Sequence, residues 1–414
     1  MREQRRVCGV PAWALSLCIL CALLVGLAGC APGAGIFAGG NWNSTGLRGK
    51  HIRVLVADSS NPQVLYAGDA LDGVYATTDA GQHWSLRNQG LPAQTGVRAL
   101  SFDASNKKLF AATTGGIFST TTGGQPWNAA GRIGGDLPTD TYTSLAFDLG
   151  NAAVLYCGTA QHGVYVSTTG GVSWSPTSGA LPSGTAINAL AYDTDQHQLW
   201  AATSGGVYRT ADAGKSWQAL NTGFPRGIDV YAVRPASMSG GSTNVVFAGT
   251  GQGVFRSDDS GRHWQYGKES LSGVRVQAIL VDFRAPTTVY IATSIGVFRS
   301  TDNGELWGGI VGGSLKRQPI YALELGADGY TQLYAASDDV YLYPGSGGGF
   351  DFSRITPLIL IVAFFVLLYW LTQRNRRNRR AILTPAPAPA TEPSNVPSLN
   401  GHRPVRVDSN IEPK

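Results

Sequence analysis

The sequence predicts an all-β fold, a seven-bladed β-propeller, on three observations. The motif Ser/Thr-x-Asp-x-Gly-x-x-Trp recurs along the 414 residues, four short apolar runs fill each interval, and glycine turns separate the runs. The tryptophans that close the motif recur every 43 or 47 residues: Trp84, Trp127, Trp174, Trp217, Trp264 and Trp307. Four short strands in about 45 residues are typical of one propeller blade. With 54 glycines and 14% charged residues, the composition excludes a coiled coil or a disordered acidic chain.

The four strand signals of each blade follow one another in a fixed order. The first is an apolar run that ends near an aspartate, as from Val97 to Asp103. A short turn leads to the second, such as Val64 to Gly68, and the third begins with Gly-Val-aromatic, as at Gly73 to Tyr75. The tryptophan of the motif opens the fourth strand.

The motif itself predicts the turn between the third and fourth strands. In the copy from Ser300 to Trp307, the hydroxyl and the carboxylate can hold the turn by bonding to nearby backbone groups. Gly304 allows a positive φ that a side chain resists, and the tryptophan can bury a large apolar area between blades. Thr122 and Thr169 replace the aspartate in two copies and still offer a hydroxyl.

The two ends of the repeat array predict seven blades and the way in which the ring closes. A seventh set of three strand signals runs from Ile320 to Tyr343, but Pro344 and a glycine run follow where its fourth strand is due. Trp42 lies 42 residues before Trp84. Residues near Phe37 to Asn43 therefore supply the outer strand of the last blade, and the closed ring exposes only short strand edges.

The N-terminal residues 1–29 have the pattern of a secretory signal, with three arginines before an apolar run. The tetrapeptide at 27–30, Leu-Ala-Gly-Cys, resembles the lipobox of bacterial lipoproteins, in which the cysteine is acylated and becomes the mature N-terminus. This resemblance implies lipidation of Cys30. The alternative is an uncleaved anchor helix, because the apolar run approaches the ~20 residues that span a bilayer. On either reading the chain that follows is exported.

The C-terminal part of the chain predicts a membrane helix. Residues 344–354 form a glycine-rich linker, and residues 355–373 are nineteen uncharged residues that predict a transmembrane helix. Five arginines follow at once, and the positive-inside rule places them in the cytoplasm. Residues 374–414, basic and then proline-rich, predict a disordered cytoplasmic tail. We therefore expect a protein of a bacterial plasma membrane, with the membrane as a partner and the propeller outside the cytoplasm.

The repeats resemble the Asp-box repeat, also called the bacterial neuraminidase repeat. This repeat occurs in sialidases, in sortilin-type propellers and in propellers of the photosystem II stability/assembly factor type. The resemblance covers residues 35–343, with six copies of the motif in register. This resemblance implies a propeller fold. It implies much less about function, because the repeat occurs in both enzymes and non-enzymes.

The sequence gives no catalytic residue, metal site or cofactor. Phe283-Arg284-Ala285-Pro286 resembles a sialidase motif, but the repeat places it at the turn between a first and a second strand. The propeller contains only three glutamates, so we can assign no carboxylate pair of the kind that glycosidases use. The histidines lack metal-ligand spacing. Cys157 is the one cysteine beyond Cys30, and we expect it to be a small buried residue.

One face of the ring remains as a candidate binding surface. The loops from each fourth strand to the next blade share this face with the loops between second and third strands. The basic loop residues expected there are Arg48, Lys50, Arg226, Arg275, Lys316 and Arg317. A polar column near the start of the innermost strands adds Arg53, Arg98, Thr143, Asn188, Tyr231, Gln277 and Tyr321. We expect these residues to surround the mouth of the central channel.

Propellers of the photosystem assembly-factor type carry an arginine patch on such a face. The resemblance implies a protein partner or an anionic ligand at the basic face, and a merely solvated rim is the other interpretation. Much of the net charge of +5 comes from the end segments, so we expect no nucleic acid as partner. We expect a non-enzymatic binding or assembly module. The alternatives are a surface glycoside hydrolase or carbohydrate-binding protein of the sialidase-like superfamily, and a sensor that signals through the membrane helix.

Overall fold

The computed structural model describes residues 41–131, 136–148, 150–179, 181–236, 244–267, 271–282, 284–310, 315, 317–326 and 332–344. The chain divides into two units between Gly347 and Gly348, and all of the described residues lie in the first. Within these residues no helix is long and apolar enough to cross a membrane. The predicted signal segment, Cys30, the membrane helix, the tail and the linker after Pro344 lie outside the described part of the chain, whereas Pro344 itself ends the last strand.

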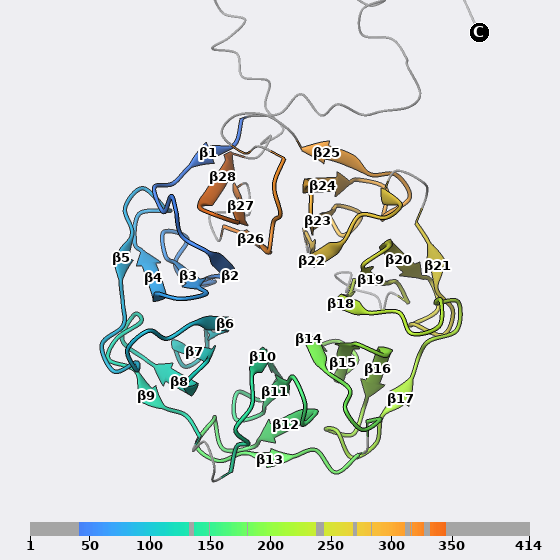
Figure 1. The fold of residues 1–414 in the computed structure, drawn as a ribbon, viewed down its shortest axis with the longest axis horizontal. Coiled ribbons are helices and arrows are strands. Elements are labelled where there is room, and N and C mark those ends of the chain that lie inside the picture. The colour runs from blue at the N-terminus through green and yellow to red at the C-terminus, as the bar shows by residue number, and fades with distance from the viewer. Residues whose placement is uncertain are drawn as a thin grey trace, which may run out of the picture. The chain divides into compact units, whose positions relative to one another are not determined.

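The described residues form seven four-stranded antiparallel sheets, which confirms the predicted seven-bladed β-propeller. Figure 1 shows the sheets arranged in a ring, each with its first strand nearest the centre. The innermost strands are β2 (Ile52–Ala57), β6 (Val97–Asp103), β10 (Tyr142–Phe147), β14 (Ile187–Asp193), β18 (Val230–Pro235), β22 (Val276–Val281) and β26 (Ala322–Leu325). The second strands are β3 (Leu65–Asp69), β7 (Lys108–Thr113), β11 (Leu155–Thr159), β15 (Gln198–Thr203), β19 (Val246–Thr250), β23 (Val289–Thr293) and β27 (Gln332–Ala336).

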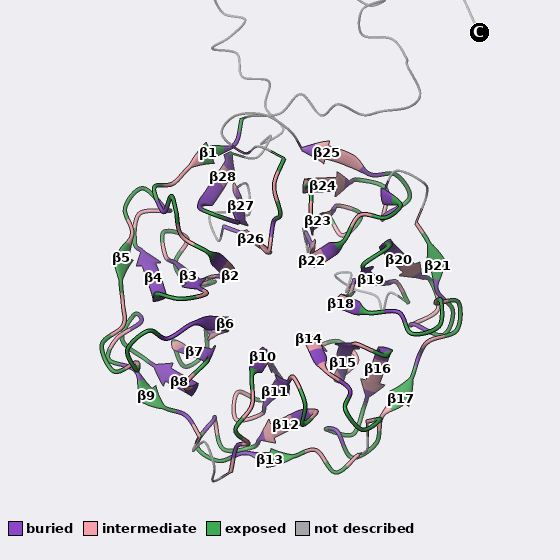
Figure 2. Ribbon diagram, in the orientation of Figure 1, coloured by how far each residue is buried: buried purple, intermediate pink, exposed green. Residues whose placement is uncertain are grey.

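The outer half of each blade contains one longer and one very short strand. The third strands are β4 (Gly73–Thr77), β8 (Gly116–Thr120), β12 (Val164–Ser167), β16 (Gly206–Thr210), β20 (Gly253–Ser257), β24 (Gly296–Ser300) and β28 (Val340–Pro344). The outer strands are β5 (Ser85–Leu86), β9 (Asn128–Ala129), β13 (Ser175–Pro176), β17 (Gln218–Ala219), β21 (Gln265–Tyr266), β25 (Gly308–Ile310) and β1 (Asn43–Ser44). Figure 2 shows that buried residues gather in the inner strands, whereas five of the outer strands are wholly exposed.

The N-terminal strand closes the ring as predicted, although its position differs slightly. β1 pairs antiparallel with β28, so that Asn43 lies opposite Leu342 and Ser44 opposite Tyr341. The predicted strand near Phe37 to Asn43 therefore begins at Asn43, and the part before residue 41 lies outside the described residues. The other outer strands likewise begin just after the tryptophan of the motif, whereas the sequence predicted that the tryptophan opens them.

The tryptophans join neighbouring blades, as the sequence predicted. The indole Nε1 of Trp127, Trp174 and Trp264 donates to a backbone oxygen of the preceding blade at 2.7 to 3.0 Å. Trp42 makes the equivalent bond to the oxygen of Ile310 at 3.1 Å and so ties the first residues of the ring to the sixth blade. Because these indoles are buried between apolar clusters, each bond satisfies a donor that would otherwise lack a partner.

The motif forms the turn that its residue types predict. The hydroxyl of Ser300 donates to the carboxylate of Asp302 at 2.7 Å and accepts from the amide of Gly304 at 2.8 Å. The same carboxylate accepts from the amide of Leu306 at 2.9 Å. Where Thr169 replaces the aspartate, its hydroxyl accepts the equivalent amide of Ser173 at 2.9 Å. The turn is thus held within one blade by local side-chain bonds.

Candidate functional site

A column of β-bulges places the predicted polar residues at the channel mouth. In six blades the register between the innermost and second strands shifts after the first residue, as between Ile52 and Val54. The extra residues are Arg53, Arg98, Thr143, Asn188, Tyr231 and Gln277. Because a bulge redirects the side chain of its extra residue, all six leave the regular alternation of the strand at the same level of the ring. Tyr321, directly before β26, occupies the seventh position.

Four side chains of this bulge column reach the following blade. The hydroxyl of Thr143 donates to the oxygen of Ile187 at 2.5 Å, and the amide of Asn188 donates to the oxygen of Val230 at 2.8 Å. In two further blades an arginine of the following blade lies over the tyrosine ring of the column. These pairs are Arg275 over Tyr231 at 3.8 Å and Arg53 over Tyr321 at 3.7 Å, measured from the guanidinium carbon to the ring centre. Cation–π contacts hold both guanidinium groups in place without neutralising their charge.

The basic residues at the mouth differ in how far they are already paired. Lys50 is paired, because its ammonium lies 2.8 Å from the carboxylate of Asp72 and over the ring of Tyr75. The ammonium of Lys50 donates to the carboxylate of Asp72, and hydrogen bonding to Asp72 and Tyr75 raises the pKa of Lys50; the bond from Lys50 lowers the pKa of Asp72. Arg48 is 78% exposed, and its Nε lies 3.2 Å from the hydroxyl of Ser44 and 3.9 Å from the carboxylate of Asp339.

The other arginines of the mouth form no ion pair with a described carboxylate. Arg98, Arg226, Arg275 and Arg317 are exposed, and none of them forms an ion pair within the described part of the chain. Arg53 is half-buried, and its Nε is buried without a hydrogen-bond partner among these residues. Gln277 is half-buried, and Lys316 lies outside the described residues. The mouth therefore combines Arg53 and Arg275, which are fixed on tyrosine rings, with the further exposed arginines Arg98, Arg226 and Arg317.

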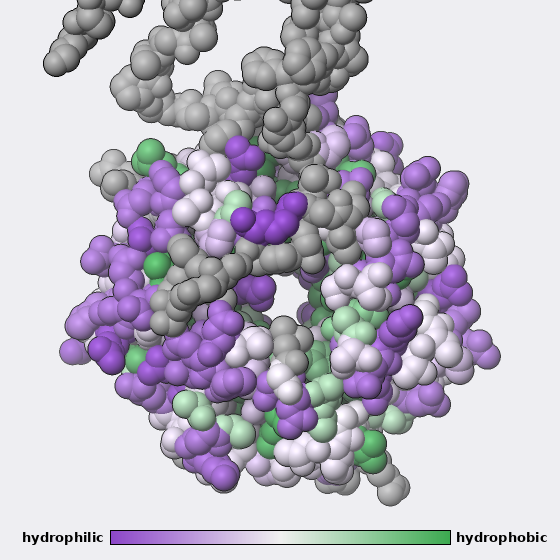
Figure 3. All heavy atoms as spheres, turned by 180° about the vertical axis from the view of Figure 1, so that it is seen from behind, coloured by the Kyte–Doolittle hydropathy of each residue, from purple (hydrophilic) through white to green (hydrophobic). Residues whose placement is uncertain are grey.

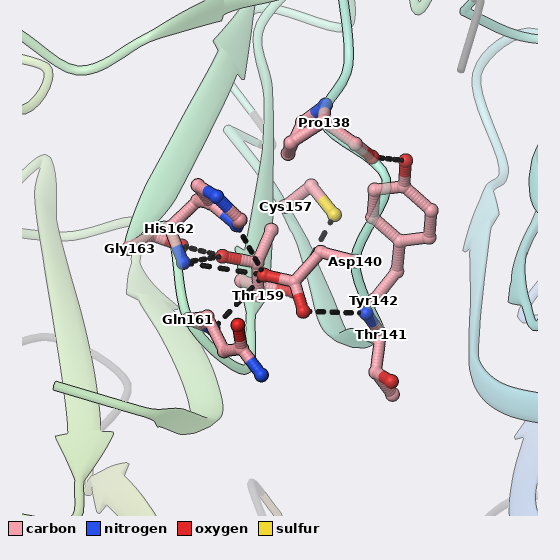
Figure 4. A network of polar contacts seen from close by, with 10 residues as sticks. Pro138, Asp140, Thr141, Tyr142, Cys157, Thr159, Gln161, His162 and Gly163 are labelled. Atoms are coloured by element: carbon pink, nitrogen blue, oxygen red, sulfur yellow. Dashed lines mark hydrogen bonds and ion pairs between the residues drawn. The ribbon is translucent and has the colours of Figure 1, made fainter. Parts of the chain in front are cut away.

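The structure also shows a network between the shielded carboxylate of Asp140 and the exposed side chain of His162, which sequence reasoning missed (Figure 4). The carboxylate of Asp140 accepts from the amides of Thr141 at 2.6 Å and Gln161 at 2.9 Å, and lies 2.8 Å from Nδ1 of His162. Burial opposes ionisation of Asp140, yet these hydrogen bonds lower its pKa overall. Cys157 lies beside this network, and burial raises the pKa of its thiol, which makes it an unreactive packing residue as expected.

The network fastens two loops of the third blade and shapes a small groove. Asp140 precedes β10 and His162 lies between β11 and β12, so 22 residues separate two side chains that meet in space. Their spacing matches no known ligand or catalytic motif, and only the paired ends of antiparallel strands bring them together. A groove of about 250 Å³ lies against His162, Pro182 and Thr185.

A larger and more apolar groove lies on the fifth blade. It measures about 760 Å³ and is lined by Phe224, Gln252, Phe255 and Tyr266 among others. The ring of Phe224 packs edge-on against Phe255 with centres 5.0 Å apart, and Tyr266 packs against Phe255 at 5.1 Å. Tyr266 is 41% exposed, and its hydroxyl donates to the backbone oxygen of Gln252 at 2.6 Å.

The described residues contain no group of three or more His, Cys, Asp or Glu that could hold a metal ion. The segment at Phe283 to Pro286 forms a turn, because the amide of Arg284 donates to Asp282 at 3.0 Å and the amide of Ala285 to its backbone oxygen at 3.0 Å. This confirms its interpretation as a turn, with Phe283 outside the described residues. The aspartates on the loops act likewise, since Asp69 accepts from the amides of Leu71 and Asp72 at 2.8 Å.

Comparison with known proteins supports the fold alone. No protein-family model matches the sequence, and no curated protein matches it. Among solved structures, the extracellular domain of a protein described as a hybrid two-component system of B. thetaiotaomicron is 14% identical with a TM-score of 0.60, covering 73% of this chain and 40% of that one. YCF48 from Cyanidioschyzon merolae is 15% identical with a TM-score of 0.56, covering 74% of this chain and 98% of that one.

A third structural neighbour is an enzyme. The xyloglucanase of glycoside hydrolase family 74 from Xanthomonas campestris is 15% identical with a TM-score of 0.59, covering 75% of this chain and 54% of that one. This chain thus spans about 40% of the B. thetaiotaomicron domain and about half of the xyloglucanase. At such identities the likeness shows the propeller fold, and the fold hosts both binding proteins and enzymes.

Proposed function

We propose that this propeller is a protein-binding or assembly module that takes an acidic segment of its partner at the basic channel mouth. The observation that carries this proposal is the pair of cross-blade contacts in which Arg53 lies over Tyr321 and Arg275 over Tyr231. Each guanidinium is held on a ring that leaves its charge and its planar donors available for a carboxylate. Side chains fixed before binding lose less entropy on association.

The surroundings of the mouth favour an anionic ligand. Arg98, Arg226 and Arg317 add exposed charge that no described carboxylate neutralises. Like charges gathered on one face raise the local concentration of an oppositely charged partner and speed its association. The structural neighbour YCF48 is also known bound to a D1 peptide, which supports a protein segment as ligand of this fold.

We further propose that the protein acts at a bacterial plasma membrane. This proposal rests on the lipobox-like segment at Cys30 and the apolar residues 355–373, which lie outside the described residues. The five arginines that follow place the tail in the cytoplasm and the propeller outside it.

Binding of an acidic peptide to the full-length protein in detergent tests the proposed function. A fluorescein-labelled octaglutamate peptide is titrated, and its anisotropy gives the affinity of the wild type and of the double variant Arg53→Ala/Arg98→Ala. If each charge contributes about 0.7 kcal/mol, the double variant binds about tenfold more weakly. Binding should also weaken as salt rises, because screening shortens the reach of exposed charges.

The control variant removes the same charge from the opposite end of the blades. Lys215 and Arg262 are exposed residues of the turns between third and outer strands, and Lys215→Ala/Arg262→Ala should bind the peptide like the wild type. Equal losses in the two double variants would mean that net charge, not the mouth, attracts the peptide, and the proposal would be wrong.

A carbohydrate is the second candidate ligand, favoured by the aromatic groove of the fifth blade. The exposed ring of Tyr266 and the amide of Gln252 offer the apolar face and the polar group that sugar rings commonly use. Titration with xyloglucan oligosaccharides and the variant Tyr266→Ala separates this reading from the first. Saturable binding that Tyr266→Ala abolishes, together with no binding of octaglutamate, would favour it.

A further inference from the structure

The outer edge of the fifth blade differs from that of the other blades. In β20 and β21, Phe255 lies opposite Tyr266. Each of the other blades also has an aromatic residue in its third strand, but the partner in the outer strand is not aromatic. These partners are Leu86, Ala129, Pro176, Ala219, Gly309 and Ser44. Of the seven outer strands that the structure describes, only β21 therefore has an aromatic ring at this place.

The loop that leads into the fifth blade carries a second aromatic residue. Phe224 occupies the place in this loop where the corresponding loops of the other blades have a leucine. These leucines are Leu47, Leu91, Leu137, Leu181, Leu271 and Leu315. The ring of Phe224 stacks on Trp264 with centres 4.8 Å apart and meets Phe255 edge-on at 5.0 Å. Together with Tyr266, these rings give the fifth blade an aromatic surface that the corresponding residues of the other blades cannot form.

The groove of about 760 Å³ beside these rings is formed by segments that hydrogen bonds tie together. The backbone oxygen of Gln252, in the turn between β19 and β20, accepts from the hydroxyl of Tyr266 at 2.6 Å. The same oxygen accepts from the amide of Gly273, in the loop after β21, at 3.1 Å. Because these bonds fix the walls before a ligand arrives, binding in the groove loses little entropy to their ordering.

Two of the segments that line the groove continue into arginines of the mouth. Pro225 lines the groove and is followed directly by Arg226. Gly273 lines it from the other loop and lies two residues before Arg275. Both arginines are exposed. The groove therefore combines apolar rings with positive charge on both loops, which suits an apolar side chain between acidic residues.

The turn at Gln252 also connects the groove with the mouth. Gly251 precedes Gln252 and lies against the ring of Tyr231, because a Cβ placed on it would lie 3.7 Å from Cε2 of that ring. Tyr231 carries the guanidinium of Arg275 at 3.8 Å. Its hydroxyl donates to the exposed carboxylate of Asp229 at 3.4 Å. Groove and mouth are thus continuous across the fifth blade.

A bound segment can therefore extend from the mouth to the groove. Figure 3 shows that the centre of the ring is open, and the mouth surrounds this opening. In Figure 1, β20 and β21 lie further from the centre than β18, the strand that contains Tyr231. A segment that binds at the mouth and runs outwards over the fifth blade passes the groove.

We propose that the groove of the fifth blade binds an aromatic side chain of the partner's acidic segment. This inference rests on the proposed function, since the carboxylates on either side of that residue bind to Arg226 and Arg275. The aromatic side chain packs against Phe255 and Tyr266 in the edge-on or offset geometry that aromatic pairs prefer. A neutral sugar leaves both arginines without a ligand, so these charges favour a peptide in the groove over a carbohydrate.

Two labelled peptides of equal charge test this inference. One is a fluorescein-labelled nonapeptide of glutamates with a phenylalanine at its centre, and the other has an alanine there instead. Both are titrated with the full-length protein in detergent, and anisotropy gives the two affinities. The phenylalanine peptide should bind about tenfold more tightly, because the groove buries its ring. Arg53→Ala/Arg98→Ala should weaken both peptides by a similar factor and leave their ratio unchanged.

Two variants of the groove should remove this preference. Tyr266→Ala removes one aromatic wall and should reduce the ratio of the two affinities to about threefold or less. Ser272→Trp places a large side chain at an exposed residue that lines the groove, and should reduce the ratio to about one because the groove is filled.

Each of these variants has a matched control in another blade. Leu86→Ala truncates the exposed residue that takes the place of Tyr266 in the first blade. Ser183→Trp enlarges the exposed residue that takes the place of Ser272 in the loop after the third blade. In both loops a glycine of similar φ follows the serine, 75° at Gly184 and 72° at Gly273. Both controls should keep the roughly tenfold preference.

Equal affinity of the wild type for the two peptides would overturn this inference and leave the acidic ligand of the mouth in place. Failure of both peptides to bind would overturn it together with the proposed function. A preference that persists in Tyr266→Ala and Ser272→Trp, or that Ser183→Trp also abolishes, would count against the groove as well. Xyloglucan oligosaccharides that bind at Tyr266, with no advantage for the phenylalanine peptide, would assign the groove to a sugar.

The melting temperature of each variant shows whether it folds. Should Tyr266→Ala not fold, Ser272→Trp retains the test, because Ser272 is exposed and its replacement removes no packed ring.

Discussion

At the residue scale, the repeated turns depend on a few atoms whose replacement has a calculable cost. Gly304 lies at φ 83°, and a Cβ placed on it would meet Cε1 of Phe247 at 2.5 Å. Phe247 is fully buried in the preceding blade. The glycine of the motif is therefore needed both for its backbone angle and for the close approach of a neighbouring ring.

Gly304→Ala should destabilise the propeller by about 3 kcal/mol, from left-handed backbone strain and overpacking against Phe247. Gly170 is the matched control, because it also has a positive φ of 65° but a Cβ there meets nothing within 4 Å. Ala80 and Ala213 hold the equivalent position in other blades at φ 56° and 59°, so Gly170→Ala should cost at most about 1 kcal/mol. Urea unfolding compares the two, and equal costs would refute the role given to Phe247.

The turn carboxylates make stability depend on acid pH. The pKa of Asp79 falls to about 2 through bonds from the backbone and ring of His83 and from Thr77. The pKa of Asp212 falls to about 2 through Ser216 and Thr210, and that of Asp259 through His263 and Ser257. Because these folded values lie below the ordinary ~3.9, the stabilisation is complete above pH ~4 and is lost as pH falls towards 2.

Urea midpoints measured between pH 5 and pH 2 should therefore decline steeply below pH 4. The variant Asp212→Asn keeps the side chain's shape but does not titrate, so it should be less stable at pH 5 and show a shallower decline. A midpoint of the wild type that stays constant from pH 5 to pH 2 would contradict this account of the turns.

At the scale of the elements, the sequence predicted most of the fold and the polar column, but neither the bulges nor the contacts between blades that position its side chains. The motif spacing predicted the seven blades, and Trp42 predicted the closing strand. Both predictions were possible because the repeated motif marks the same position in every blade. The polar residue types of the column that includes Arg53 are visible in the sequence, but the bulge itself depends on how the innermost and second strands pair. The contact between Asp140 and His162 depends on the conformations of two loops. The periodicity of a single sequence does not predict such loop conformations.

The hydrogen bond from Trp42 to Ile310 is the element-scale tie that closes the ring. Trp42→Phe keeps the aromatic packing but leaves the buried oxygen of Ile310 without this donor, which should cost about 1 to 3 kcal/mol. Trp307 is the control, because its buried Nε1 has no hydrogen-bond partner among the described residues. Trp307→Phe should therefore destabilise the propeller less than Trp42→Phe does. Thermal unfolding of both variants measures the two losses of stability. A larger loss for Trp307→Phe would argue against this closing tie.

At the scale of the whole molecule, the anchoring proposal predicts separable effects of its two segments. Cys30→Ala should abolish incorporation of an alkyne-labelled fatty acid and leave the protein in the membrane fraction, because residues 355–373 still span the bilayer. Deletion of 355–414 should leave the protein in that fraction as well, held by the lipid. The double variant should be released. Fatty-acid labelling that persists in Cys30→Ala would contradict the proposal that Cys30 is the lipidated residue.

In each blade the channel mouth and the turn of the repeated motif lie at opposite levels. The innermost strands begin at the mouth, and the turns of the motif lie at the opposite ends of the third strands. The side chains of Gln277 and Leu306 represent these two levels: Gln277 is in the bulge column, and Leu306 is 64% exposed in a turn of the motif. A ligand of the mouth must touch the first level and not the second.

Photo-cross-linking of octaglutamate to the full-length protein therefore tests the central claim most directly. Benzoylphenylalanine is placed at position 277 in one variant and at position 306 in another, and the cross-linked product is measured after illumination. Binding at the mouth predicts a strong product from position 277, suppressed by unlabelled peptide, and background from position 306. Equal products from both positions, or a product from position 306 alone, would contradict the assignment of the mouth as the binding site.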